Sequence, residues 1–201
     1  MSAALVSPPP APTSEALPRK RFTREEVDRM LDAGFFVGQR FELIDGDLID
    51  KMGQNPQHAS SIGRVSRRLT SLCGMDTVLV QVPIEASVAD SNRSLPEPDV
   101  AVLRELKADY DVRHPRGDET LLVVEIAETT VAFDLSRKAI LYARAGVPEY
   151  WVLDLVRRVL VVHRQSDGSQ FKLIQIHTED EMVSMEGRPE AVKVKDLLPA
   201  H

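Results

Sequence analysis

The chain has 201 residues, of which 43% are hydrophobic, and a formal net charge of −6. This length predicts one well-cored domain, and the acidic balance argues against a surface coated with basic residues for non-specific nucleic-acid binding. Because Cys73 is the single cysteine, an internal disulfide framework and a cysteine-based zinc site are excluded, and a reducing cytoplasm is favoured.

The N-terminal segment is predicted to be a tail. Residues 1–20 are rich in Pro, Ala and Ser and cannot bury enough surface to offset the entropy lost on ordering, so we expect disorder or a tether. The segment lacks the basic flank and apolar core of a signal peptide, and no apolar run approaches the length of a membrane span. A single domain is expected over residues 21–201.

The first part of that domain is predicted to hold two helices and a hairpin. Thr23 and Glu26 match a capping box at the start of a helix that ends by Gly34. Asp45-Gly46 is a preferred two-residue hairpin turn within residues 41–49. A second helix begins near Asn55-Pro56 and closes at Gly74, with one apolar face. That face carries residues at steps of three and four: His58, Ile62, Val65, Leu69 and Leu72.

Strand-like runs dominate the rest of the chain. Four of them cover residues 77–81, 84–88, 99–103 and 121–127, and the last is apolar without alternation, as in a strand covered on both faces. A third helix, with Asp134 as its N-cap, is expected to run to about Ala145. Further strands are predicted over residues 150–154, 159–164 and 170–176, followed by a short pair and an ending over 194–198. The fold class is therefore α/β or α+β, with a mixed sheet and a few helices.

Two acids stand out because they lie in apolar strands. Asp99 follows Pro98, and Glu125 follows four apolar residues. Burying an ionised group without a partner is costly, whereas two carboxylates on neighbouring strands can hold a cation such as Mg²⁺ and activate its water. The alternative is structural: Asp99 caps the start of a strand and Glu125 pairs with an arginine.

Three residues of the third helix share one face. Lys138 lies four residues after Asp134, and Tyr142 is one turn further along. A lysine beside a metal can orient the attacking water and stabilise developing negative charge. The alternative for Lys138 is an ordinary surface ion pair with Asp134.

Two further residues are candidates of lower rank. Glu42 is either an additional metal ligand or a carboxylate on the wet face of the hairpin. His58 lies on the apolar stripe of the second helix, where a packed or capping histidine is commoner than a ligand.

Together these strings resemble the Uma-two family of restriction-endonuclease-like proteins, which belongs to the PD-(D/E)XK nuclease superfamily. The resemblance covers roughly residues 22–198. Its most specific piece is Gly146-Val-Pro-Glu-Tyr-Trp151, and the segments around Glu42, His58, Pro98-Asp99, Glu125 and Lys138 agree with it.

The resemblance implies a restriction-endonuclease-like fold, a mixed sheet flanked by helices with additional antiparallel hairpins. It implies that Asp99 and Glu125 bind Mg²⁺ or Mn²⁺ and that Glu42 is a further ligand. The superfamily pattern places a lysine two residues after the second acid, where this chain has Ala127. The family's usual substitute comes from the following helix, here Lys138. His58 matches a recurrent family histidine.

The expected function is that of a cytoplasmic, Mg²⁺-dependent endonuclease that hydrolyses DNA, with a homodimer expected from the fold. The missing lysine at position 127 keeps open a catalytically inactive module that binds or regulates. Hydrolysis of a small phosphoester is a third possibility. The three are separable by cleavage assays and by the salt dependence of binding.

Overall fold

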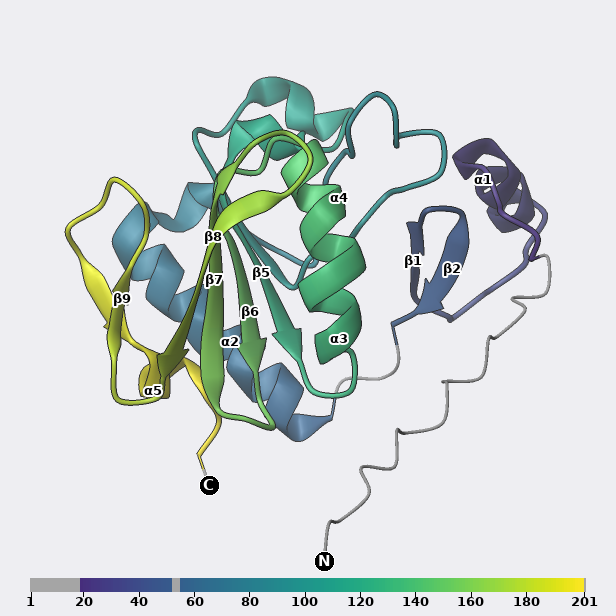
Figure 1. Ribbon diagram of the computed structural model, residues 1–201. Coiled ribbons are helices and arrows are strands. Elements are labelled where there is room, and N and C mark those ends of the chain that lie inside the picture. The colour runs from purple at the N-terminus through teal and green to yellow at the C-terminus, as the bar shows by residue number, and fades with distance from the viewer. Residues whose placement is uncertain (1–18, 52–54, 201) are drawn as a thin grey trace, which may run out of the picture.

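A six-stranded mixed sheet forms the centre of the computed structural model, which describes residues 19–51 and 55–200 (Figure 1). Neighbouring strands are antiparallel except β5 and β6, which are parallel. The fold class predicted from the sequence is thus confirmed. In spatial order the strands are β3 (Val78–Val80), β4 (Val100–Leu103), β5 (Thr120–Ala127), β6 (Tyr150–Asp154), β7 (Val159–Ser166) and β8 (Phe171–Thr178).

Helices cover both faces of this sheet. α2 (Pro56–Cys73) lies behind the strands in Figure 1, and a second helix lies in front of them. We call the helix in front the crossover helix, because it makes the connection that the parallel β5–β6 pair requires. It consists of α3 (Val131–Phe133), a π-helical turn labelled η4 (Asp134–Lys138) and α4 (Ala139–Arg144).

Alternate residues of β5 face the two helical layers. Val124 packs in the core cluster that contains Leu69 of α2, whereas Ala127 packs in the cluster that contains Tyr142 of α4. Because side chains alternate along a strand, Glu125 shares the face of Ala127 and points toward the crossover helix. Coverage on both faces explains why this strand reads as an apolar run.

A helix and a hairpin precede the sheet. α1 (Arg24–Asp32) begins with the expected capping box, in which the Glu26 N–H donates to Thr23 Oγ1 and the Thr23 N–H donates to Glu26 Oε2. β1 (Phe41–Ile44) pairs with β2 (Asp47–Asp50). Asp45 and Gly46 join them with φ angles of 50° and 82°, as a two-residue hairpin turn requires.

The helix predicted between Asn55-Pro56 and Gly74, which is α2, also begins and ends as predicted. Asn55 caps α2, since its Oδ1 accepts from the His58 N–H at 2.9 Å, and Pro56 is the first helical residue. Gly74 follows the last residue of the helix. The remaining elements are short: η1 (Met75–Thr77), η2 (Ala108–Asp111), η3 (Gly117–Glu119), an antiparallel pair of β9 (Met182–Ser184) and β10 (Ala191–Lys193), and α5 (Val194–Leu197).

Two sequence predictions are wrong. Residues 84–88 form no strand: the Ile84 and Glu85 N–H groups donate to Pro96 and Pro115, so this segment bonds to loops instead of a ladder. Asp134 is not an N-cap, because the helix already begins at Val131. The Asp134 carboxylate lies inside the helix and accepts a hydrogen bond from Thr130 Oγ1 at 2.6 Å.

The predicted tail over residues 1–20 lies outside the described residues, apart from its last two positions. In the described part of the chain, no helix is both long and apolar enough to cross a membrane.

Gly46 lets the hairpin approach the chain at Arg21, and we expect Gly46→Ala to lower the free energy of unfolding. A Cβ there would lie 2.9 Å from Arg21 Cβ and 3.0 Å from the Phe22 carbonyl oxygen. This contact adds to the cost of a left-handed conformation, which is about 1–2 kcal/mol for a residue with a side chain. Gly168→Ala is the control, since Gly168 has a similar φ of +84° but open space around it. Urea unfolding should show the larger loss for Gly46→Ala, and equal losses would contradict the contact.

Candidate active site

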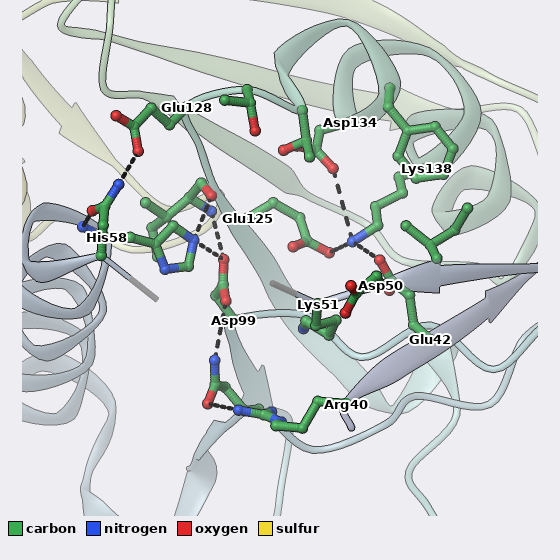
Figure 2. Close-up of a pocket in the computed structure, with 17 residues that line it drawn as sticks. Arg40, Glu42, Asp50, Lys51, His58, Asp99, Glu125, Glu128, Asp134 and Lys138 are labelled. Carbon is green, nitrogen blue, oxygen red and sulfur yellow. Dashed lines mark hydrogen bonds and ion pairs between the residues drawn. The ribbon is translucent and has the colours of Figure 1, made fainter. Parts of the chain in front are cut away.

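Glu125 lies at the middle of the candidate site. It sits near the end of β5 and is 3% exposed, beneath the crossover helix (Figure 2). Its Oε1 accepts two hydrogen bonds from that helix, from Lys138 Nζ at 2.9 Å and from the Tyr142 hydroxyl at 2.8 Å. No described residue other than these donates to the carboxylate, so Oε2 is left for a ligand.

Lys138 is enclosed by carboxylates. Besides Glu125, its Nζ lies 2.7 Å from Glu42 Oε1 and 3.8 Å from Asp134 Oδ1. The lysine is 3% exposed, and all three acids are buried. We call Glu42, Glu125 and Asp134 the carboxylate cage. The surface ion pair considered for Lys138 and Asp134 is therefore not what the structure shows, because both groups are buried and their distance exceeds that of a hydrogen bond.

The helix that carries Lys138 is widened at this point. The Ala139 N–H donates to the Asp134 carbonyl oxygen five residues earlier, and this oxygen also accepts from the Tyr150 hydroxyl at 3.1 Å. A single π-helical turn inside an α-helix is rare and occurs frequently at functional sites. Here it runs from Asp134, which belongs to the carboxylate cage, to Lys138, which the cage encloses.

Asp99 directly precedes the neighbouring strand, β4. Because Val100 of β4 pairs with Val124 of β5, the register brings Asp99 beside Glu125. Asp99 is 3% exposed, and its Oδ2 accepts from the Ile126 N–H at 2.9 Å. Its Oδ1 faces the Gln81 amide at 3.4 Å, a long contact that leaves this oxygen the weaker bound of the two.

His58 braces Asp99 from α2. Its Nε2 lies 2.8 Å from the Ile126 carbonyl oxygen and 3.4 Å from Asp99 Oδ2. Since a carbonyl oxygen only accepts, Nε2 carries the hydrogen. Figure 2 shows His58 on the far side of Asp99 from Lys138. The structure thus gives His58 a bracing contact to the acid, not a place in the carboxylate cage.

The charged groups of the site, together with burial, shift each other's pKa values. Burial raises the pKa of the Glu125 carboxyl above its ordinary value, while the Lys138 ammonium acts in the opposite direction and favours the carboxylate. Burial likewise raises the pKa of Asp134 to about 6. Burial alone would lower the pKa of Lys138, but the three surrounding carboxylates raise it, so the ammonium stays charged.

On the other side of the site, Asp99 and His58 shift in favour of their ionised forms. Burial would raise the pKa of Asp99, but the His58 hydrogen bond and the Lys51 charge lower it below its ordinary value. Burial would lower the pKa of His58, but the contact with Asp99 raises it. Asp99 is therefore the acid of the site that stays ionised most readily.

Both carboxylate oxygens of Glu42 have partners in the protein. Its Oε1 contacts Lys138, and its Oε2 accepts from the Glu97 N–H at 3.1 Å. Through these two contacts Glu42 connects β1 with the crossover helix and with the backbone at Glu97. Across the described residues, no group of three or more acidic, histidine or cysteine side chains is placed to hold a metal ion, and the three acids of the carboxylate cage converge on the Lys138 ammonium instead.

A cavity of about 360 Å³ opens onto these groups (Figure 2). Carboxylates outnumber the basic residues that line it, and oxygen donors are what Mg²⁺ and Mn²⁺ prefer. Mg²⁺ is usually held by one or two carboxylates with waters and substrate phosphates, so Asp99 Oδ1 and Glu125 Oε2 fit such an ion. The charged lining residues are Glu42, Asp50, Asp99, Glu125, Glu128 and Asp134 with Arg40, Lys51, His58 and Lys138.

Sequence reasoning missed several residues of this cavity. Gln81 follows β3 with a φ of +54°, and its amide lies between Asp99 and Arg40. Lys51 follows β2 and pairs with Glu97 at 3.4 Å. Nothing in the sequence marks Gln81, because its positive φ is not encoded by a glycine. The alternation of side chains along the hairpin could have indicated that Lys51 lines the cavity together with Ile49.

The fold and the site define a nuclease-like protein with a mixed sheet and a lysine–carboxylate cluster at its centre. The model of the Uma2 family, described as "putative restriction endonuclease", matches residues 24–194, so the chain belongs to this family. The resemblance found in the sequence is thereby confirmed. No curated protein matches the chain.

Among solved structures, the chain is similar to a "putative nuclease belonging to DUF820" from Anabaena variabilis. The TM-score is 0.67 and the identity 14%, over 88% of this chain and 97% of that chain. At this identity the likeness shows the fold alone.

The Tyr142 hydroxyl is predicted to stabilise the buried Glu125 carboxylate. Tyr142→Phe should lower the free energy of unfolding by about 1–2 kcal/mol, because a buried hydrogen bond to a charged group is lost. Tyr110→Phe is the matched control: the Tyr110 hydroxyl is buried and has no partner among the described residues, so its removal should cost little. Chemical denaturation of both variants measures the difference, and a larger loss in Tyr110→Phe would contradict the assignment.

Proposed function

We propose that this protein is a Mg²⁺- or Mn²⁺-dependent endonuclease that hydrolyses phosphodiester bonds of DNA. The observation that carries the proposal is the meeting of Asp99, Glu125 and Lys138 at one open cavity. Membership in the Uma2 family supports the same reaction class. In this proposal Asp99 and Glu125 hold the ion, which when bound lowers the pKa of a water molecule and offsets charge on the phosphate.

The side chains of the chain have separate tasks in this reaction. A water molecule attacks phosphorus and loses a proton to solvent, while the P–O bond to the leaving sugar oxygen breaks and that oxygen takes up a proton from solvent. Lys138 has three N–H groups, of which two bind Glu42 and Glu125, so one remains for the attacking water or a phosphate oxygen. The fixed ammonium stabilises the negative charge that develops on the phosphoryl oxygens.

DNA as the substrate is supported by local rather than overall charge. The net charge of −6 gives no general attraction for a polyanion. Arg40 and Lys51 line the cavity on the side of Asp99, and both are tied to Glu97. They are the basic groups placed to meet a backbone phosphate. We extend the proposal to a cytoplasmic homodimer, because a duplex has two strands and each chain carries one such site.

The competing function is a nuclease-fold module that binds or regulates without chemistry. Ala127, which stands where the superfamily pattern has its lysine, favours it. In that case the carboxylate cage is a structural feature that fixes the helix to β5. Fold membership does not decide between the two functions, since function depends on the site.

Asp99→Asn separates the two functions. The substitution keeps the shape of the side chain and removes the charge that would bind the ion. We expect it to abolish Mn²⁺ binding by calorimetry and to slow cleavage of plasmid DNA by about 100-fold or more, since metal catalysis supplies several kcal/mol. Glu125→Ala should give the same losses.

Asp76→Asn is the control, because Asp76 is exposed and lies away from the cavity. It should retain both activities. If the unaltered protein cleaves no DNA form with either Mg²⁺ or Mn²⁺, the module replaces the nuclease as the function of this chain.

A further inference from the structure

The positive charge inside the carboxylate cage is the ammonium group of Lys138, a side chain of the protein itself. Three acids from different elements surround the Lys138 ammonium: Glu42 from β1, Glu125 from β5 and Asp134 from the π-helical turn (Figure 2). Each of the four side chains is 5% exposed or less. Such a set of oxygens around one buried positive charge has the composition of a hard-cation site.

Glu125 belongs to both halves of the site. Its Oε1 contacts the Lys138 ammonium, while Oε2 is left for the ion proposed above. In two-metal nucleases and phosphatases the ions lie about 3.5–4 Å apart and act on the two sides of the reacting phosphate. In this protein the positive charge beside Glu125 Oε1 is the Lys138 ammonium, and the ion proposed above would lie beside Oε2.

We propose that Lys138 occupies the position of a second metal ion, so that each chain binds one divalent cation and cannot bind two. This inference rests on the proposed function for the identity of the first site. Glu42 and Asp134 are then positioning residues that hold the lysine, and neither is a ligand of the ion bound by Asp99.

The packing of the helix keeps the ammonium in place. Lys138 is anchored in a helix whose next turn places Tyr142 against Glu125. Arg137 fixes the same helix to the β1–β2 hairpin through Asp47 at 3.0 Å and the Ile44 carbonyl oxygen at 3.1 Å. A divalent ion that entered the cage would meet a like charge that cannot withdraw, so it is excluded.

Removal of the lysine should turn the cage into a metal site. Without Lys138, three carboxylates would be buried together with no counter-charge, an arrangement that is costly unless a cation enters. We expect Lys138→Gln to bind one more Mn²⁺ per chain than the unaltered protein, by titration calorimetry and by counting bound Mn²⁺ with electron paramagnetic resonance. The melting temperature should also rise more steeply with Mn²⁺ than that of the unaltered protein.

Two controls locate the extra ion. Lys172→Gln removes a surface lysine that does not line the cavity, and its Mn²⁺ stoichiometry should be unchanged. Adding Glu42→Gln to Lys138→Gln should remove the extra ion. An unchanged stoichiometry in Lys138→Gln, or a gain of one ion in Lys172→Gln, would overturn the inference.

Glu42→Gln alone decides the matter if Lys138→Gln does not fold. It retains the ammonium with two of its three acids and should bind Mn²⁺ with the same stoichiometry and within about threefold of the same affinity. Loss of Mn²⁺ binding in Glu42→Gln would make Glu42 a metal ligand and refute the inference. If the unaltered protein binds no Mn²⁺ while Lys138→Gln binds one ion, the metal of the proposed function fails, and with it the count of one ion per chain, whereas the assignment of the Lys138 ammonium to a cation position is upheld.

Discussion

The buried ion pair between Lys138 and Glu125 is the interaction on which the arrangement of this protein depends. Placing either charge in the interior costs several kcal/mol, which a single partner offsets only in part. The lysine therefore takes contacts from Glu42 and Asp134 as well. These contacts join the sheet, the crossover helix and the β1–β2 hairpin, which is not hydrogen-bonded into the six-stranded sheet. These charged contacts thus add to the Leu43–Leu95 bridge and to the Arg137 contacts in fixing the position of the hairpin.

The most family-specific segment of the sequence contributes more to the packing of the fold than to the candidate site. In residues 146–151, Glu149 is 1% exposed and accepts from Trp151 Nε1 at 2.7 Å and from the Arg164 guanidinium. It also accepts from the Glu186 N–H at 2.6 Å, which ties the C-terminal strands to β6. A string can therefore identify the family reliably while saying little about the reaction.

Local patterns predicted the elements well and the contacts between them poorly. The caps at Thr23 and Asn55, the Asp45-Gly46 turn and the apolar run of β5 are all encoded within a few residues. The acids beside apolar residues pointed to the candidate site, because a buried charge is conspicuous in a sequence, and Asp99 and Glu125 are both buried. The partners of Glu42 come from distant parts of the chain, and no spacing rule could show that Lys138 and Glu97 engage both of its oxygens.

The position of the lysine follows from how the space beside Glu125 is filled. Ala127 is fully buried and packs in the cluster that contains Ala139 and Tyr142 of the crossover helix. A lysine at position 127 would need the volume that these side chains occupy, and overpacking a core is destabilising. A small residue on the strand lets the helix approach closely, and the helix then supplies the ammonium from Lys138. The departure at Ala127 and the buried lysine are thus two parts of one packing solution, in which the positive charge beside Glu125 is retained.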